Sequence, residues 1–386
     1  MIKKNIITCI TAGFSLLAVL LAFPACDIEG VEEVPHLHAV FEDAFMIGTA
    51  LNHAQIYGED RNGILLARTH FNSITPENVT KWELIHPEKG EYDFEAADRF
   101  VEFGEENGMF MVGHTLVWHS QTPDWVFEDE DGDPRSRDEL MEIMREHIHT
   151  VVGRYAGRIH AWDVVNEALN EDGSLRESPW YEIIGEDYLI KAFEYAREAD
   201  PDAELYYNDY SLEDTEKLEG AIRLVEYLQE NNAPITGIGT QGHYLMDWPS
   251  IEDVEKTITD LAALGIDVMV TEMDIDVLPP AFEYQGADIA MRADLEDDLN
   301  PYPDELPDYM QEELAERYKE IFEVFLKHRD VITRVTFWGV TDGDSWKNNW
   351  PVRGRTNYPL LFDREWQPKL AFFSVVELAQ DVLDNE

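Results

Sequence analysis

The sequence predicts a closed (β/α)8 (TIM) barrel. Eight short apolar runs, rich in β-branched and aromatic residues, alternate with longer amphipathic stretches along most of the chain. Strands that alternate with helices build parallel βα units, and a count of eight favours closure into a barrel. A doubly wound open sheet is the alternative, although no glycine-rich phosphate-binding turn follows the first run. With 386 residues and 44% apolar content, the chain can bury the core of one such domain.

The individual elements follow from these patterns. Strands are predicted at 45–51, 71–75, 110–118, 159–166, 205–210, 238–244, 268–275 and 335–340. Helices are predicted at 96–106, 137–155, 188–199, 218–231, 251–264 and 312–328. The segment 282–309 contains several Pro and Asp residues, and we expect it to be a loop that shapes the barrel mouth rather than a separate domain.

The N-terminus has the pattern of an export signal. Lys3 and Lys4 precede a nearly continuous apolar run over 6–23, which ends shortly before Cys26. The charge, the length and the small residue before the cysteine predict a signal peptide over 1–25. An uncleaved membrane anchor is the alternative, because the run approaches the length of a membrane span.

Cysteine usage is consistent with a place in the cell envelope. The chain has two cysteines, Cys9 inside the apolar run and Cys26 after it, so cleavage would leave no pair for an intrachain disulfide. Cys26 resembles the lipid-modified first residue of a bacterial lipoprotein, and secretion with a free thiol is the alternative. We therefore expect an exported protein, either an envelope lipoprotein that faces outward or a secreted one. An acidic tether over 26–36 would then lead into one barrel domain over 37–386.

Acidic residues dominate the charge of the chain. There are 29 Lys and Arg against 80 Asp and Glu, which gives a formal net charge of −51. Because these acids are spread along the whole length, they predict an acidic folded surface rather than a disordered tail. Self-repulsion of this size destabilises a compact state in dilute buffer, and about 1 M salt largely screens it. We expect a halophilic monomer that does not bind nucleic acid and that touches a membrane only through a lipid on Cys26.

Two glutamates lie at the ends of strongly apolar predicted strands. Glu167 closes the segment 162–167, and Glu272 lies within 270–274. Functional residues of a barrel lie at the C-terminal ends of its strands, so both side chains should face the mouth. Glycoside hydrolysis needs such a pair, one carboxyl to protonate the leaving oxygen and one to attack or to activate water. A separation of about 5 Å implies retention and a wider one inversion, and the sequence leaves this distance open.

Histidines and aromatic residues gather at the same strand ends. Asp274 shares a strand face with Glu272 and could hold His243 in one tautomer while the imidazole bonds Glu272. A metal site is the competing interpretation of His114, His119 and His243, but their spacing matches no known ligand pattern. Candidates for stacking on sugar rings are Trp82, Trp118, Trp338 and Trp346, and candidates for bonding hydroxyls are Asn78, Lys81, Asn166 and Gln241.

Taken together, these motifs resemble glycoside hydrolase family 10, the endo-β-1,4-xylanases. The resemblance covers about 39–378, nearly the whole mature chain. It is carried by FNSITPEN through KW (71–82), GHTLVWH (113–119), WDVVNE (162–167), YNDY (207–210), GTQGH (239–243), TEMD (271–274), and FWGVTD with SW (337–346). Several such segments in the right order are far more specific than any one of them.

The resemblance implies retention of configuration, with Glu167 as the acid/base, Glu272 as the nucleophile, and neither cofactor nor metal. It implies glycone subsites built by Glu77, Asn78, Lys81, His114, Trp118, Asn166, Gln241 and His243, with Asn208, Asp274 and His119 in support. Trp338 and Trp346 should cover the sugar and exclude hexoses, because xylose lacks the hydroxymethyl group of glucose. The implied substrates are xylan and xylooligosaccharides.

Two other functions are compatible with the same residues. One is a different retaining β-1,4-glycanase on this barrel, such as a cellulase or a mannanase. The other is a non-catalytic surface lipoprotein that binds glycans. Such a protein would be free to lose either glutamate, whereas this chain retains both Glu167 and Glu272.

Overall fold

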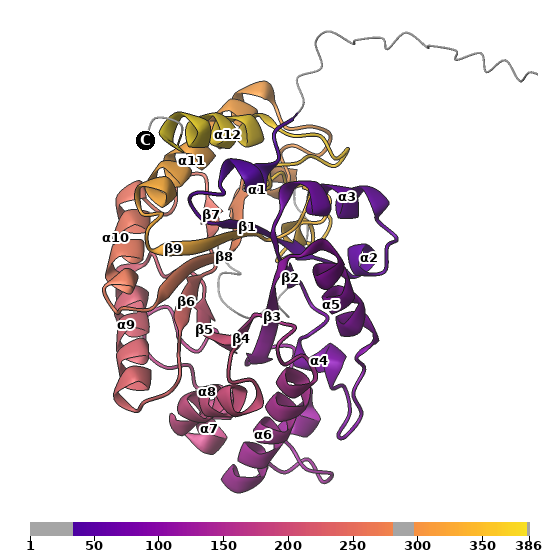
Figure 1. Ribbon diagram of the computed structural model, residues 1–386, viewed down its shortest axis with the longest axis vertical. Helices are drawn as coiled ribbons and strands as arrows, with labels where there is room; N and C mark the ends of the chain where they lie inside the picture. The colour runs from indigo at the N-terminus through magenta and orange to yellow at the C-terminus, as the bar shows by residue number, and fades with distance from the viewer. Residues whose placement is uncertain (1–33, 281–296, 384–386) are drawn as a thin grey trace, which may run out of the picture. The chain divides into compact units, whose positions relative to one another are not determined.

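Eight parallel strands close into a barrel in the computed structural model, which describes residues 34–280 and 297–383 (Figure 1). Neighbouring strands pair in the order β6, β5, β4, β3, β2, β1, β9 and β8, and β8 pairs again with β6, which closes the ring. These strands are β1 Met46–Leu51, β2 Ser73–Pro76, β3 Phe110–Val117, β4 Ala161–Asn166, β5 Glu204–Asp209, β6 Gly237–Thr240, β8 Asp267–Asp276 and β9 Ile332–Phe337. The predicted (β/α)8 fold is confirmed.

The sixth predicted strand, 238–244, is interrupted. Its first part is β6, and its last residues begin a separate short strand, β7 (His243–Leu245), which pairs only with the C-terminal end of β8. The interruption falls at Gly242, whose φ of 79° lies in the left-handed region that glycine adopts easily. This turn brings His243 directly opposite Asp274 of β8.

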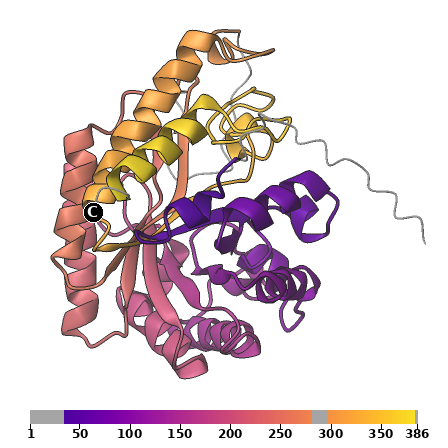
Figure 2. The ribbon, with the colours of Figure 1, turned by 45° about the horizontal axis from the view of Figure 1, so that its top comes forward.

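Helices surround the strands on the outside of the ring (Figure 1). They are α1 Leu37–Val40, α2 His53–Ile56, α3 Arg61–His70, α4 Trp82–Ile85, α5 Glu95–Asn107, α6 Arg137–Arg154, α7 Pro179–Ile184, α8 Asp187–Ala199, α9 Thr215–Glu230, α10 Ile251–Ala262, α11 Asp308–Lys327 and α12 Leu370–Leu383. The described residues also form the 3-10 turns η1 Asp124–Val126, η3 Asp297–Leu299 and η4 Trp346–Asn348. All six predicted helices are present, as α5, α6 and α8 to α11, whereas α3 and α12 were not predicted. Figure 2 shows α11 in orange and α12 in yellow, packed side by side.

The strands are buried over nearly their whole length, as expected where helices cover the outer face of a parallel sheet and side chains fill the inner one. Each of them therefore reads as an almost continuous apolar run, and polar residues are concentrated where the strands end. That concentration creates a single polar rim at the C-terminal end of the barrel.

Some sequence predictions concern residues outside the described ranges. The signal peptide over 1–25, Cys26 and nearly all of the tether over 26–36 belong to this group, as does the first half of the segment 282–309. In the described part of the chain, no helix combines the length and the apolar content that crossing a membrane requires.

Candidate active site

A cleft of about 980 Å³ opens at the C-terminal ends of the strands. Both glutamates line it, together with all ten residues predicted to bind sugar: Glu77, Asn78, Lys81, His114, Trp118, Asn166, Gln241, His243, Trp338 and Trp346. Side chains from most of the barrel strands or their following loops therefore meet in one cavity. This is the face on which barrel enzymes build their active sites.

Glu167 follows the last residue of β4 and is 7% exposed. Its backbone has a φ of 55°, which is uncommon for a residue with a side chain and is found preferentially at functional sites. Its backbone N–H donates to the carbonyl of Asn208 at 2.9 Å, which fixes this conformation. The carboxylate accepts from Trp118 Nε1 at 2.8 Å and from Gln241 Nε2 at 3.0 Å. Both of these donors are uncharged.

Glu272 lies within β8, where the pairing with β9 shifts register between Val270 and Met273. Such an irregularity re-aims the side chains of a strand. One carboxylate oxygen accepts from Asn208 Nδ2 at 2.8 Å, and the other lies 3.3 Å from His243 Nε2. Burial raises the pKa of Glu272, but the hydrogen bond from His243 and the charges of nearby cationic groups outweigh it, so the net pKa is below its ordinary value.

His243 lies between two carboxylates. Its Nε2 faces Glu272, and its Nδ1 forms an ion pair with Asp274 Oδ1 at 3.0 Å. Burial lowers the pKa of His243, but Asp274 and Glu272 reverse this effect and raise it to about 9. Asp274 and Glu272 thus lie at the two ring nitrogens of His243, and a carboxylate at each nitrogen favours the doubly protonated imidazolium over either neutral tautomer.

Asn208 joins the surroundings of the two glutamates. Its Nδ2 donates to Glu272 and also to Asn166 Oδ1, at 3.0 Å, while its Oδ1 accepts from Thr271 Oγ1 at 2.6 Å. Asn208 is fully buried, so these bonds fix the orientation of its amide. Asn208 thus lies beneath the cleft rather than in its wall.

A buried lysine also lines the cleft. Lys81 Nζ donates to Asn78 Oδ1 at 3.1 Å and to Gln121 Oε1 at 3.0 Å, and it lies 4.9 Å from the ring centre of Trp118. Burial lowers the pKa of Lys81, while Glu272 and Glu77 act in the opposite direction. Burial raises the pKa of Glu77. These donors and acceptors, with an indole face beside them, are suited to binding the hydroxyl groups of a sugar ring.

Two aromatic contacts define the shape of this part of the cleft. His114 is held by Asp163 at 2.8 Å and meets the Trp338 ring edge-on at 5.2 Å. On the far side, Trp346 donates through Nε1 to Asp274 Oδ2 at 2.9 Å and stacks on Trp350 at 4.8 Å. Trp338 and Trp346 therefore both line the cleft in fixed orientations.

One sequence expectation differs from what the structure shows. Trp82 does not offer a face to the cleft: it is 2% exposed and stacks on His147 at 3.6 Å, because helix α4 turns it toward α6. His119, expected in a supporting position, is not among the residues that line the cleft, and its ring contacts that of Trp118 edge-on at 5.8 Å.

Several cleft residues were not predicted from the sequence. They are Gln121, Glu171, Tyr210, Ser211, Asp214, Leu245, Asp247, Trp248, Pro280, Gly343, Asp344, Ser345, Lys347, Asn349 and Trp350. Most lie in loops several residues beyond a strand end, where the alternating pattern no longer indicates which way a side chain points. Lys347 could have been suspected from its position next to Trp346, and Tyr210 from its place in the segment 207–210.

Within residues 34–280 and 297–383, no three His, Cys, Asp or Glu side chains form a group that could hold a metal ion. The cleft itself presents two carboxyl groups with different surroundings. A (β/α)8 barrel with two buried glutamates facing an open, aromatic-lined cleft defines the protein as a glycoside hydrolase of the two-carboxylate kind.

Comparison with known proteins identifies the family. The sequence pattern of glycosyl hydrolase family 10 matches residues 36–378, and the chain belongs to that family. It is 45% identical to a β-1,4-xylanase from Dictyoglomus thermophilum over 364 residues, covering 94% of this chain and 96% of the relative. It is 43% identical to endo-1,4-β-xylanase A from Xylanibacter ruminicola over 344 residues, with coverage of 89% and 93%.

Solved structures give the same result. A GH10 endoxylanase retrieved from a sugarcane soil metagenome superposes with a TM-score of 0.85 at 46% identity, covering 90% of this chain and all of the other. Xylanase XynB from Paenibacillus barcinonensis superposes with a TM-score of 0.80 at 42% identity, with coverage of 89% and 99%.

Proposed function

We propose that this protein is a retaining endo-1,4-β-xylanase that cleaves internal β-1,4-xylosidic bonds of xylan and xylooligosaccharides. The observation that carries the proposal is the contrast between the two glutamates of one cleft. Glu272 lies beside the imidazolium of His243, and the pKa of Glu272 is lowered. Glu167 is hydrogen-bonded by the uncharged groups of Trp118 and Gln241. Carboxyl groups with such different environments can divide the roles of nucleophile and acid.

In the first step, a Glu272 oxygen forms a bond to the anomeric carbon while the glycosidic carbon–oxygen bond breaks, and Glu167 gives its proton to the leaving oxygen. The product is a glycosyl ester of Glu272. In the second step, Glu167 takes a proton from water, the water oxygen bonds to the anomeric carbon, and the ester bond to Glu272 breaks. Both residues return to their starting states, and the configuration is retained after two inversions.

We assign the selection of xylose over glucose to the residues that build the glycone subsites of the cleft. Lys81, Asn78 and Gln241 bond sugar hydroxyls, and the indoles of Trp338 and Trp346 cover the ring. Xylose has no hydroxymethyl group, so a pocket closed by two indoles accepts it and excludes glucose by sterics. This selection separates the proposed activity from that of a cellulase or a mannanase.

The test is product analysis on plain β-1,4-xylan and on carboxymethyl cellulose, each at low and at high salt. Short xylooligosaccharides from xylan alone are expected. Equal release from cellulose would favour a broader β-glycanase. Binding of xylan to a folded protein without release of reducing ends would favour a glycan-binding lipoprotein.

The location of the protein is proposed to be outside the cytoplasm. The segment 1–25 acts as an export signal, and Cys26 becomes the first residue and carries lipid. The support is the charge and hydrophobicity of 1–25 together with the position of Cys26. Mass spectrometry of the mature N-terminus separates the outcomes, because a diacylglyceryl mass on Cys26 is expected and an intact Met1 would contradict cleavage.

The protein is further proposed to be a salt-adapted monomer. The support is its net charge of −51, which produces repulsion between copies as well as within one chain. Light scattering coupled to size exclusion should give the mass of one chain at both low and high salt, and a stable dimer would contradict the proposal.

A further inference from the structure

Three carboxylates follow one another along one face of β8. They are Glu272, Asp274 and Asp276, each two positions after the one before, so their side chains lie on the same side of the strand. They are 5%, 0% and 7% exposed, respectively. We call these three residues the carboxylate row. Like charges placed so closely and shielded from water raise one another's pKa unless cations compensate for them.

Cations alternate with the members of the row. His243 lies between the first two carboxylates, at 3.3 Å from Glu272 and 3.0 Å from Asp274. Lys347 lies between the last two, with its Nζ 3.5 Å from Asp274 Oδ1 and 3.9 Å from Asp276 Oδ2.

Beyond Lys347, Arg355 Nη2 lies 3.6 Å from Asp276 Oδ1 and donates to the carbonyl of Pro279 at 3.1 Å. With His243 protonated, three negative and three positive charges therefore alternate along the face, and the group as a whole is neutral.

Lys347 has the position of a charge partner rather than of a surface residue. Its side chain is 9% exposed, and it lies in η4 next to Trp346, whose indole bonds the other oxygen of Asp274. Both oxygens of Asp274 are thereby occupied, Oδ1 by two cations and Oδ2 by an N–H. Because the pairs are buried, salt screens them far less than it screens surface charges.

We propose that Lys347 is a positioning residue: it supplies the positive charge that balances the carboxylate row and so keeps Glu272 ionised. The proposal rests on the assignment of Glu272 as nucleophile and adds a residue that acts on it through Asp274 and His243. The other titratable or charged groups that face the row are Lys81, Glu77 and His114 near Glu272, and Tyr318 of α11 near Asp274.

The test replaces the charge while keeping the shape of the side chain. In Lys347→Met the row carries one uncompensated negative charge, so the acid limb of the pH profile of kcat/KM on xylan should move up by about half a unit to one unit. Lys347→Arg keeps the charge and should leave the limb at its wild-type position. Arg355→Gln removes the more distant cation and should move the limb in the same direction by a smaller amount.

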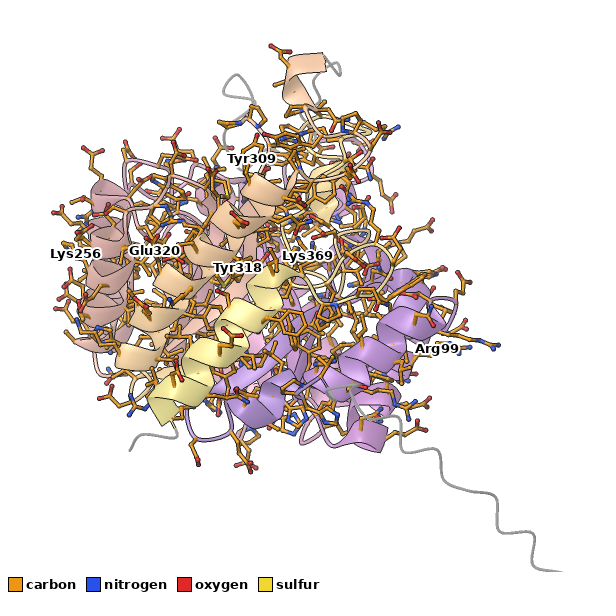
Figure 3. All side chains as sticks on the ribbon, turned by 90° about the horizontal axis from the view of Figure 1, so that it is seen from above. Arg99, Lys256, Tyr309, Tyr318, Glu320 and Lys369 are labelled. Carbon is orange, nitrogen blue, oxygen red and sulfur yellow. The ribbon has the colours of Figure 1, made fainter. Side chains whose placement is uncertain are left out.

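A control removes one positive charge far from the cleft. Lys256 lies on α10, pairs with Asp260 and is half exposed (Figure 3). Lys256→Met should leave the limb unchanged in about 1 M NaCl, whereas the shift in Lys347→Met should persist there because its partners are buried.

A second readout does not depend on turnover. This readout is the pKa of His243, measured by NMR titration of the resting protein with isotope-labelled histidine. The His243 signal is assigned by its loss in His243→Gln. In Lys347→Met, the loss of the nearby cation should raise the pKa of His243 above that of the wild type. Lys347→Gln serves for both measurements where the methionine variant does not fold.

An unchanged acid limb together with an unchanged His243 titration would overturn the proposal. So would equal shifts in the Met and Arg variants, because the charge would then be irrelevant. A wild-type protein that does not hydrolyse xylan would overturn the proposed function instead, and the His243 titration would still decide the role of Lys347.

Discussion

The two glutamates of the cleft differ in their neighbours more than in their burial. Glu167 and Glu272 are 7% and 5% exposed. Glu167 is bonded by an indole and an amide, whereas Glu272 faces the imidazolium of His243. A carboxyl that must attack as an anion gains from an adjacent cation, and a carboxyl that must begin with a proton does not. The chemistry is therefore specified by the neighbouring residues.

His243 should make stability depend on pH. Its folded pKa of about 9 exceeds the ordinary value of 6.5. The stabilisation is therefore fully present below pH 6.5 and is lost as the pH rises through about 9. At about 1.4 kcal/mol per pKa unit, up to about 3 kcal/mol is expected to disappear across this window.

The measurement is the difference in unfolding free energy between the wild type and His243→Gln, taken every half unit between about pH 6 and pH 10. The difference isolates His243 from the buried histidines His70 and His86, whose pKa values are lowered to about 4 by burial. A difference that stays constant over this range would contradict the cationic state of His243.

The sequence located the site residues better than it described their interactions. Their positions at strand ends indicated that Glu167, Glu272 and the residues expected to bind sugar would meet in one cleft, because the strand ends of a closed barrel converge. The sequence could not predict that the side chain of Trp82 is buried against α6 rather than exposed to the cleft, since that depends on the orientation of the short helix α4. Nor could it predict the charge pairing of Lys347, whose partners come from a strand some seventy residues earlier in the chain.

Among the elements, β3 and β4 show how tightly the barrel is packed. Gly113 of β3 lies against the ring of Trp162 in β4, and a Cβ added there would be 2.2 Å from two ring carbons. Trp162 is fully buried and has no room to withdraw. Glycine at this position is therefore required by the approach of a large side chain.

Gly113→Ala should destabilise the protein by about 2–3 kcal/mol or more, because overpacking forces the ring or the strand to shift. Gly153→Ala is the matched control: that glycine is exposed near the end of α6, and an added Cβ would meet nothing within 4 Å. The control should stabilise by about 0.5–1 kcal/mol, since alanine favours a helix. Chemical denaturation measures both, and equal effects would contradict the packing account.

There are physical reasons why the sequence did not predict helix α12 and strand β7. Helix α12 (Leu370–Leu383) is apolar on several sides and packs against α11, and an apolar run of this kind does not by itself distinguish a helix from a buried strand. Strand β7 is only three residues long and is separated from β6 by a turn at Gly242, which a run of apolar residues does not reveal. Long periodic helices such as α6, α9 and α11 were predicted to within a few residues at each end.

The molecule as a whole is dominated by negative charge. The excess of acid over base is 51. Figure 3 shows side chains that end in carboxylate oxygens along the outward faces of the helices. Some of the basic residues are engaged in close pairs: Arg154 bonds both oxygens of Asp98 at 2.9 and 2.6 Å, and Arg158 bonds both oxygens of Glu105 at 2.8 and 2.7 Å. Such pairs leave most of the acidic surface uncompensated.

Salt should therefore stabilise the fold. Between about 0.1 M and about 3 M NaCl the melting temperature is expected to rise, steeply at first as the Debye length falls toward about 3 Å. Thermal unfolding followed by circular dichroism gives the result, with sucrose at matched osmolality as a control that does not screen charge. A flat or falling melting temperature in NaCl would argue against salt adaptation.

The most direct test of the account is the configuration of the product that azide forms with Glu272→Ala. The variant should not hydrolyse an activated aryl β-xyloside, because no carboxylate remains to attack the anomeric carbon. Azide fits the space that the side chain leaves and should restore turnover, with α-xylosyl azide as the product. The anomeric coupling constant in the proton NMR spectrum identifies this inverted product. A β-azide, or unimpaired hydrolysis without azide, would show that Glu272 is not the nucleophile.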